Sequence, residues 1–202
     1  MKVALLQSQI KDLDIENNLQ KHISLLRGLN SDTELAVMCE EFLTGFTSNV
    51  QLAQSMDCYA IKALCQVAKE KNMAISTSLF IKENEKYFNR HFFFFPNGEY
   101  EYYDKRHLFC LSGEPKVVSP GKKRKIIEYR GFKIALFTCY DLRFPLWCAN
   151  SYSEESGYEY DVAIFVACWA QERAYAFKQL LIARAIENVS YVIGLNRVGR
   201  VS

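Results

Sequence analysis

Apolar runs and amphipathic helical patterns alternate along the first half of the chain. Short, almost continuous apolar runs predict buried strands at residues 3–7, 34–38 and 73–80. Helical spacing of apolar residues predicts helices at residues 17–29 and 50–71. In the first of these helices one face carries Leu19, Ile23, Leu26 and Leu29. This order of elements is typical of an α/β fold whose largely parallel strands are buried on both faces.

Hairpin signals interrupt this alternation in the centre of the chain. Pro96-Asn97-Gly98 separates two aromatic-rich runs, 87–95 and 99–103, and Asn-Gly is a strong signal for a tight turn between antiparallel strands. Arg130-Gly131 separates the runs 125–129 and 132–138 and predicts a second hairpin. The sequence therefore predicts antiparallel strands in addition to the parallel ones.

The last part of the chain returns to the alternating pattern. A buried strand is predicted at 161–168, a helix at 172–188 and a final strand at 190–195. The inward face of that helix is predicted to carry Ala176, Leu180, Ala183 and Ile186. Hairpins mixed with β–α–β units are what two packed sheets with outer helices require. No repeat or linker divides the chain, so we expect one domain over residues 1–202.

The composition is that of an ordinary globular chain. Of its 202 residues 50% are hydrophobic and 24% are charged, and 25 basic against 23 acidic residues leave a net charge of +2. This balance gives no reason to expect nucleic acid as a partner. No apolar run approaches the roughly 20 residues of a membrane helix, and the first ten residues lack the features of a secretory signal. We therefore expect no membrane partner either.

The cysteines and histidines give little support for disulfides or metal. Seven cysteines make an odd count, and no two of them have the spacing of a Cys-x-x-Cys motif. A disulfide framework or a structural zinc site is therefore not predicted. The three histidines are scattered and suggest no ligand set. We expect a cytoplasmic protein that needs no metal or other cofactor.

Three polar groups each follow a predicted strand, where active sites of open α/β sheets gather. Glu40 and Glu41 follow the run 34–38, Lys105 follows the first hairpin, and Cys139 follows the run 132–138. Taken singly, each has an ordinary interpretation: a solvated acidic pair, a charged surface turn and a buried core cysteine. As a group they suggest chemistry, because a thiol at a strand-to-helix elbow can have its pKa lowered by amides or a cation.

Four segments together resemble the nitrilase superfamily of carbon–nitrogen hydrolases, and most closely its ω-amidase branch. They are Cys-Glu-Glu-Phe-Leu-Thr-Gly-Phe at 39–46, Tyr-Asp-Lys-Arg-His-Leu-Phe at 103–109, Cys-Tyr-Asp-Leu-Arg-Phe-Pro at 139–145 and Ala-Arg-Ala-Ile-Glu-Asn at 183–188. The resemblance covers essentially the whole chain. It implies an αββα sandwich, with two packed mixed sheets between outer layers of helices. It also implies a catalytic triad of Glu40, Lys105 and Cys139.

The resemblance implies roles for neighbouring residues as well. The family usually has Pro before its catalytic Glu, and Cys39 stands in that place here, which makes Glu40 rather than Glu41 the catalytic carboxylate. Glu114 matches a further Glu of the family and is expected to orient Lys105. The backbone N–H of Tyr140 is expected to help Lys105 bind the oxyanion.

The ω-amidase resemblance implies a short linear amide with a carboxylate at its far end, such as 2-oxoglutaramate. Hydrolysis would give the acid and ammonia through a thioester on Cys139. Arg143 is a candidate for gripping the carboxylate, and a salt bridge near the elbow is its alternative role. Phe46 and Trp169, with Tyr140, are candidates for the walls of the substrate slot, and plain core packing is their alternative role.

Other functions stay open on the sequence alone. A nitrilase or an N-carbamoyl amidohydrolase would use the same triad, and an inactive binding module would keep only the fold. A thiol redox protein is disfavoured because no second cysteine lies within a few residues of Cys139. Family members usually continue beyond the Asn196–Gly199 segment, so the resemblance predicts that the family's C-terminal strands are missing from a chain truncated at Ser202. It also implies a homodimer.

Overall fold

The first sheet contains five strands. The computed structural model describes residues 1–199, and within it the strands lie in their sequence order. They are β1 (Val3–Leu6), β2 (Leu35–Met38), β3 (Ala74–Glu83), β4 (Lys86–Phe94) and β5 (Tyr100–Asp104). Strands β1 to β3 pair in parallel, whereas β3, β4 and β5 form antiparallel pairs. The sheet is therefore mixed, and the β4–β5 pair in its antiparallel half is the hairpin predicted from the Asn97-Gly98 turn.

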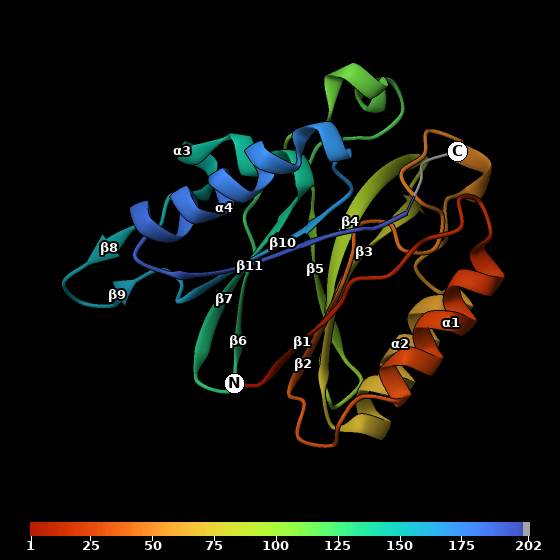
Figure 1. The fold of residues 1–202 in the computed structure, drawn as a ribbon, viewed down its shortest axis with the longest axis horizontal. Coiled ribbons are helices and arrows are strands. Elements are labelled where there is room, and N and C mark those ends of the chain that lie inside the picture. Colours follow the sequence, from red (N-terminus) through yellow and green to blue (C-terminus); the bar gives the residue numbers. More distant parts are fainter. Residues whose placement is uncertain (200–202) are drawn as a thin grey trace.

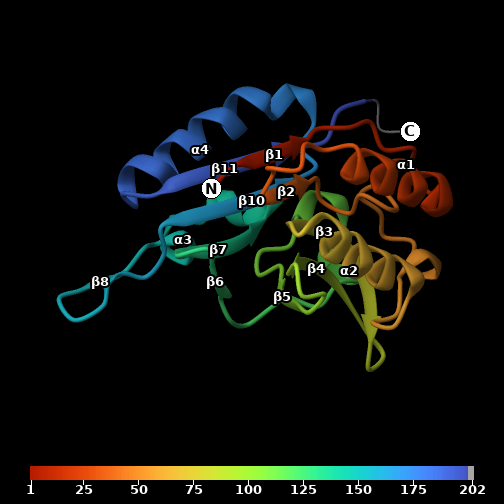
Figure 2. The ribbon, with the colours of Figure 1, turned by 90° about the horizontal axis from the view of Figure 1, so that it is seen from below.

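Over residues 1–199 the second sheet contains four strands, in the order β11, β10, β7, β6. They are β6 (Ile126–Tyr129), β7 (Phe132–Thr138), β10 (Val162–Ala167) and β11 (Tyr191–Asn196). Strands β7, β10 and β11 are parallel, and β6 is antiparallel to β7. A small hairpin of β8 (Tyr152–Ser153) and β9 (Gly157–Tyr158), which the sequence did not predict, projects from the body (Figures 1 and 2).

Helices cover the outer face of each sheet. Helices α1 (Ile15–Arg27) and α2 (Tyr59–Lys71) lie against the first sheet. Helix α4 (Ala174–Glu187) and the short α3 (Pro145–Cys148) lie against the second (Figures 1 and 2). The predicted αββα sandwich is therefore confirmed. Within residues 1–199, each helix is too short or too polar to span a membrane.

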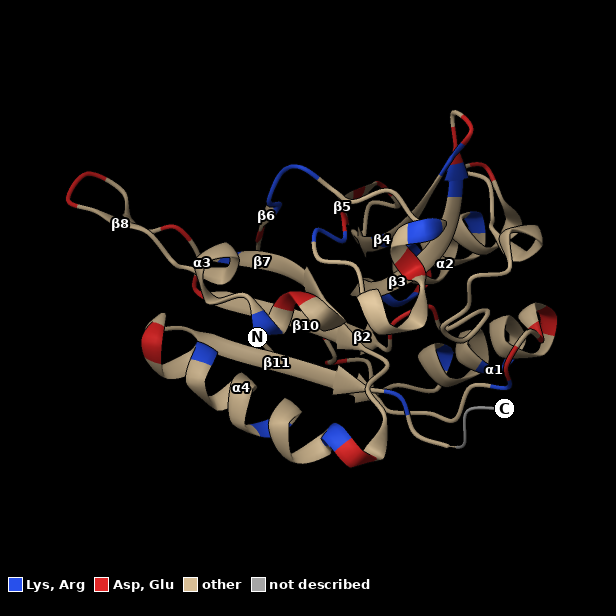
Figure 3. Cartoon of the chain, turned by 90° about the horizontal axis from the view of Figure 1, so that it is seen from above, with Lys and Arg blue, Asp and Glu red and all other residues tan. Residues whose placement is uncertain are grey.

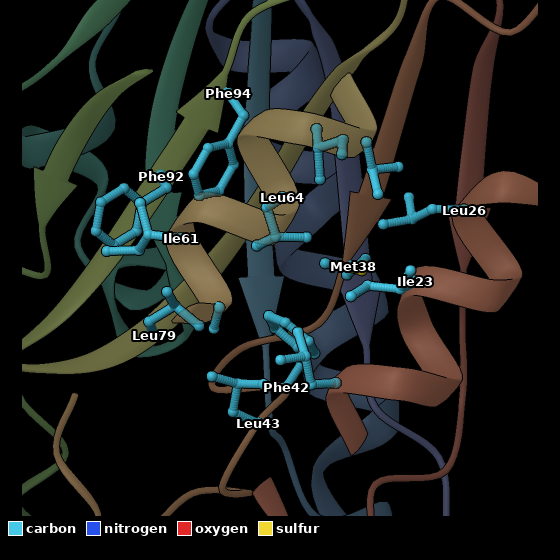
Figure 4. Close-up of a cluster of buried hydrophobic side chains, with 14 of the residues drawn as sticks. Ile23, Leu26, Met38, Phe42, Leu43, Ile61, Leu64, Leu79, Phe92 and Phe94 are labelled. Atoms are coloured by element: carbon cyan, nitrogen blue, oxygen red, sulfur yellow. The ribbon is translucent and has the colours of Figure 1, made fainter. Parts of the chain in front are cut away.

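Strand β2 shows why its apolar run is continuous. Ala36 and Met38 face the cluster beneath α1 and α2, while Leu35 and Val37 face the second sheet. Since successive side chains of a strand point to opposite faces, a strand buried on both faces needs apolar residues throughout. Figure 4 shows Met38 in the outer cluster, with Leu26 of α1 and Leu64 of α2 among its neighbours.

Charged residues lie mainly on loops, turns and helix surfaces (Figure 3). Strands β10 and β11 of the second sheet contain none. A charged side chain buried between or beneath the sheets is therefore an exception that needs a compensating partner.

Both predicted hairpins are confirmed. Gly98 has a φ of 83°, and the turn joins antiparallel β4 and β5. At the second turn Arg130 and Gly131 have φ of 49° and 77°, the pair of positive values that a type I′ turn requires. The turn between β3 and β4 at Asn84-Glu85 has positive φ at both residues too. The predicted strand ended at residue 80 and missed this hairpin.

Two helix predictions are partly wrong. The helix predicted from residue 50 begins only at Tyr59, after a single 3₁₀ turn at Val50–Leu52. Gln54 explains the interruption, because its N–H donates to Phe80 O and its carbonyl accepts from Lys82 N, each at 2.8 Å. These bonds to β3 remove Gln54 from any helix. In α4 Ile186 is 73% exposed rather than inward, and Phe177 and Arg184 are the residues of that helix that are buried.

Candidate active site

Side chains from both sheets meet at the carboxyl ends of β2 and β7, where β5 also ends. Lys105 Nζ lies 2.9 Å from Glu40 Oε1 and 3.0 and 3.1 Å from the two carboxylate oxygens of Glu114. The charges of Glu40 and Lys105 both act on the Cys139 thiol, whose sulfur therefore lies beside this pair. The structure thus brings together four residues that are up to 99 positions apart (139 − 40) in the sequence.

Glu40 is completely buried and lies directly after β2. Its Oε1 accepts hydrogen bonds from Lys105 Nζ and from Asn89 Nδ2, the latter at 2.8 Å. Its Oε2 is buried without a protein hydrogen-bond partner among the described residues. Sequence reasoning missed Asn89, although an amide within the aromatic strand β4 is a signal that would have found it. One carboxylate oxygen is therefore held in place, and the other is left available.

Lys105 is 1% exposed and follows β5. Burial alone would lower the pKa of Lys105, but the negative charges of Glu40 and Glu114 outweigh it and raise the pKa well above its usual value. The side chain is therefore a permanent ammonium. Glu114, which begins a 3₁₀ turn at Glu114–Lys116, also accepts a hydrogen bond from Phe109 N at 2.5 Å. Lys105 is thus held on two sides by carboxylates that are themselves fixed.

Cys139 begins a 3₁₀ turn, Cys139–Arg143, directly after β7, and its φ is 49°. A non-glycine residue rarely adopts this left-handed conformation, so the turn stores backbone strain. Burial and the negative charge of Glu40 raise the pKa of Cys139 well above its usual value, although Lys105 acts in the opposite direction. The expectation of a lowered thiol pKa is therefore wrong, because burial outweighs the nearby cation. The thiol is protonated in this state.

Glu41 differs from its neighbour in both contacts and charge. Its φ is 46°, and its Oε2 accepts from Thr47 N at 3.4 Å. Burial, with the charges of Glu40 and Glu114, raises the pKa of Glu41 well above its usual value, so it is a neutral acid.

Among residues 1–199, no group of three or more His, Cys, Asp or Glu side chains is placed to hold a metal ion. The carboxylates at this site surround an ammonium instead.

A pocket of about 270 Å³ opens over Cys139. The residues predicted for it all line the pocket, namely Phe46, Tyr140, Arg143 and Trp169. Sequence reasoning missed Arg173, which lies with its guanidinium 5.2 Å from the ring centre of Phe109. Arg143 lies 4.8 Å from the ring centre of Trp169. The described lining contains two arginines and no acidic residue, so the pocket is apolar with a positive mouth.

The loop after β10 is fixed where it borders this pocket. Trp169 N donates to Asn196 Oδ1 at 2.7 Å, and Asn196 Nδ2 donates to Trp169 O at 2.9 Å. The backbone of the preceding residue, Cys168, acts to lower the pKa of the Cys139 thiol. This part of the pocket wall is therefore attached to β11.

Two enzymes of known name are similar to the chain over almost all of its length. The omega-amidase YafV of Yersinia enterocolitica is 37% identical over 199 residues, which are 98% of this chain and 75% of that protein. The 2-oxoglutaramate amidase of Bacillus subtilis is 28% identical over 98% of this chain and 76% of its own length.

A solved structure has the same fold. The crystal structure of XC1258 from Xanthomonas campestris, a CN-hydrolase superfamily protein with an arsenic adduct in its active site, has a TM-score of 0.94 to this chain. It is 36% identical, and the match covers 98% of this chain and 76% of that one. Residues 2–201 match the sequence model of the carbon–nitrogen hydrolase family. The chain therefore belongs to the carbon–nitrogen hydrolases, the enzyme family that its strand-end motifs predicted.

Proposed function

We propose that the chain hydrolyses small linear amides that carry a carboxylate at the far end, such as 2-oxoglutaramate. The products are the carboxylic acid and ammonia. The observation that carries the proposal is a buried Glu40–Lys105 pair, joined at 2.9 Å, beside Cys139 at a pocket with two arginines. The named activities of the omega-amidase and 2-oxoglutaramate amidase relatives support the same substrate class.

The first half of the reaction forms a thioester. Glu40 takes the proton of the Cys139 thiol, and the thiolate attacks the amide carbon. The resulting oxyanion is met by the Lys105 ammonium and by the backbone N–H of Tyr140. As the carbon–nitrogen bond breaks, protonated Glu40 gives its proton to the nitrogen, and ammonia leaves. The raised pKa of Cys139 is why the thiol needs this base.

The second half releases the acid. Glu40 takes a proton from a water molecule, and the hydroxide adds to the thioester carbon. Lys105 again stabilises the oxyanion. The carbon–sulfur bond then breaks, and the sulfur recovers the proton from Glu40, so the enzyme returns to its starting state. Glu114 keeps Lys105 in place throughout, because both of its oxygens lie within 3.1 Å of Nζ.

Recognition of the far carboxylate falls to Arg143 and Arg173. Neither guanidinium forms an ion pair with any residue in the range 1–199, and both line the pocket that contains Cys139. An unpaired guanidinium can bind a carboxylate through two parallel hydrogen bonds. The aromatic walls give the linear body of the substrate an apolar surface. The described lining offers no carboxylate that would repel an anionic substrate.

The test compares ammonia release from 2-oxoglutaramate and from pentanamide, a neutral amide with the same number of carbons. We expect kcat/KM to favour the anionic amide by at least about 100-fold, since each charge-assisted hydrogen bond contributes about 1.5–3 kcal/mol. Arg143→Met and Arg173→Met should each reduce that preference. Equal rates for the two amides would overturn the assignment of the substrate class.

The role of Cys139 is tested by trapping the intermediate. With a slow amide substrate, intact-mass spectrometry should show the acyl group on Cys139, and Cys139→Ala should lose activity by at least about 10⁴-fold. The matched control is Cys65→Ala, which removes a half-buried thiol from α2. Turnover of nitriles or carbamoyl amines in preference to amides would favour a nitrilase or an N-carbamoyl amidohydrolase. If the protein shows neither an adduct nor turnover, a binding module would be favoured.

The outer face of α4 supports a homodimer as the assembly. Large apolar side chains at helical spacing are exposed there and form one stripe, which consists of Tyr175, Ile182 and Ile186. An exposed apolar stripe of this kind marks an association surface. Light scattering should give twice the chain mass for the parent protein and the single-chain mass for a variant with Ile182→Glu and Ile186→Glu. A monomeric parent protein would exclude the dimer.

A further inference from the structure

A second buried carboxylate lies two residues after Cys139, and the proposed chemistry does not use it. Asp141 is 0% exposed. Its Oδ2 accepts from Tyr103 OH at 2.7 Å and from Thr138 N at 3.0 Å. Its Oδ1 accepts from the backbone N and the ring Nδ1 of His107, both at 2.9 Å. Four donors thus offset the cost of burying this carboxylate.

These donors come from the two segments that carry the reacting groups. Tyr103 lies two residues before Lys105, and His107 lies two residues after it. Thr138 lies one residue before Cys139, and Asp141 lies two residues after it. The carboxylate therefore joins the loop after β5 to the turn after β7, and so links the first sheet to the second. We propose that Asp141 is a positioning residue that, through Tyr103 and His107, fixes Lys105 relative to Cys139.

The surrounding contacts leave the network little freedom to move. Tyr103 OH also accepts from Arg106 N and from Trp147 Nε1, each at 3.0 Å. Burial and the Asp141 charge raise the pKa of Tyr103 well above its usual value. The phenol therefore stays protonated, and its O–H donates a hydrogen bond to Asp141. The His107 ring stacks on Phe144 with the ring centres 3.6 Å apart and an interplanar angle of 8°. Both side-chain donors to Asp141 are thus held by further contacts.

The inference rests on the proposed function, because it explains how the oxyanion donor and the nucleophile keep their spacing. Lys105 can stabilise the oxyanion only if its ammonium lies at hydrogen-bond distance when the C–S bond forms. A displacement of about 1 Å between reacting groups can reduce the rate about 100-fold. Loosening the Asp141 network should therefore lower kcat more than it raises KM, since the substrate pocket itself is not altered.

The chain offers a matched pair of tyrosines for the test. Tyr103 and Tyr160 are each 1% exposed, and each ring packs edge-on against Phe137 with the ring centres 6.3 Å apart. Tyr160 OH, however, donates to Cys148 O at 2.6 Å rather than to Asp141. Tyr103→Phe and Tyr160→Phe thus remove the same buried hydroxyl from the same aromatic surroundings. Only the first loses a donor to Asp141.

We expect Tyr103→Phe to lower kcat for 2-oxoglutaramate by about 10–100-fold, and Tyr160→Phe to change it less than about threefold. Tyr103→Phe should lose more thermal stability than Tyr160→Phe, because it also leaves Arg106 N and Trp147 Nε1 without their acceptor. Equal kcat in the two variants would overturn the proposal. Unequal kcat at a temperature well below both Tm values would support it, because a purely structural role would lower Tm without lowering the kcat of the molecules that stay folded.

A second readout follows the thiol directly. Lys105 lowers the pKa of Cys139 against the larger effect of burial. A displaced Lys105 should therefore move the pH midpoint of iodoacetamide labelling at Cys139 upward in Tyr103→Phe and leave it in place in Tyr160→Phe. An unmoved midpoint in Tyr103→Phe would contradict the positioning role.

A conservative variant distinguishes the hydrogen-bond donor of His107 from the volume of its side chain. His107→Asn keeps an N–H donor close to the position of Nδ1, whereas His107→Leu removes it. The Asn variant should retain at least about ten times the kcat of the Leu variant, and equal kcat in the two would overturn the role of His107. Full activity of Cys139→Ala would instead overturn the proposed function. An inactive Cys139→Ala beside a fully active Tyr103→Phe would overturn the positioning role alone.

Discussion

Two buried cations lie on adjacent stretches of the first sheet, and their surroundings differ. Arg90 of β4 is 1% exposed and so is Lys105. Arg90 donates to both oxygens of Asp104 at 2.6 and 3.0 Å, and to Glu83 at 3.1 Å. Its guanidinium also lies 4.0 Å from the ring centre of Tyr102. Lys105, in contrast, shares its carboxylates with a thiol and a pocket.

Strand geometry separates the two cations. Arg90 pairs directly with Asp104 across β4 and β5, so both side chains point to one face of the sheet. Asn89 and Lys105, their neighbours in the sequence, point to the other face. Around Arg90 the carboxylate partners reach solvent, whereas around Lys105 the atoms Glu40 Oε2 and Asn89 Oδ1 are buried without a partner in the described chain. Unsatisfied polar atoms thus distinguish a site prepared for a ligand from a finished ion pair.

The largest expected effect separates chemistry from stability at Lys105. Lys105→Met should lower kcat by about 10²–10³-fold, because one oxyanion donor is lost, while circular dichroism still shows a folded chain. Ammonia release from 2-oxoglutaramate measures the change. Near-normal turnover in this variant would show that Lys105 is not an oxyanion donor. Lys105 and Arg90 would then not differ in function.

Arg90→Met is the matched counterpart. We expect it to lower the free energy of unfolding by about 3 kcal/mol, since breaking a buried ion pair leaves its carboxylates without a cation. Urea denaturation measures that loss. The kcat of the molecules that remain folded should change less than about threefold. A large fall in kcat at unchanged stability would show that the two cations are not separate in function.

His91 extends the comparison to a buried base that is neutral. It lies on the same face of β4 as Asn89, and its ring nitrogens meet Ser76 Oγ at 2.7 Å and Phe137 O at 3.1 Å. Burial lowers the pKa of His91 from 6.5 to about 3. Between these two values the unfolded chain binds a proton that the folded chain does not, so stability falls as the pH falls.

The expected contribution of His91 to that slope is about 1.4 kcal/mol per pH unit. Urea unfolding at several pH values between neutrality and about pH 5 measures it, and His91→Leu should remove about one proton from the slope. An identical slope in the variant would mean that His91 is charged in the folded protein. In that case the face of β4 beneath the site would carry a further cation.

The smallest expected effect concerns the strain at Cys139. Its φ of 49° suits glycine. The free energy of unfolding of Cys139→Gly should therefore be about 1 kcal/mol larger than that of Cys139→Ala. Thermal unfolding of the two inactive variants measures the difference. A less stable glycine variant would show that the turn is not strained and that the elbow geometry imposes no cost on the fold.

The sequence was sufficient for the layers of the fold and for the residues that gather at the site. Continuous apolar runs such as β2 and turn residues such as Asn97-Gly98 depend on local preferences, which is why they were read correctly. The motifs around Glu40, Lys105 and Cys139 lie at strand ends, and the sheet topology brings strand ends together. Spacing along the chain could therefore indicate a common location without giving its geometry.

The misses arise where distant parts of the chain override local pattern. Gln54 lies outside the helix because its backbone forms hydrogen bonds with β3. Residues 50–58 contain no signal for that pairing. Ile186 matched the inward face of a helix but lies exposed on the outer one. Arg173, Asn89 and the donors to Asp141 acquire their meaning only from neighbours far away in sequence. The raised pKa of Cys139 likewise follows from burial, which no motif reports.

The contact between Arg197 and Asp12 bears on how a newly made chain acquires its final form. Arg197 Nη1 lies 2.7 Å from Asp12 Oδ1, and Gln9 forms a parallel bridge with Val198. Partners separated by 185 residues can meet only after nearly all of this sequence has left the ribosome. Glu40 and Lys105 precede Cys139 in the sequence, so the catalytic cluster can be complete only after the turn that follows β7 has been synthesised.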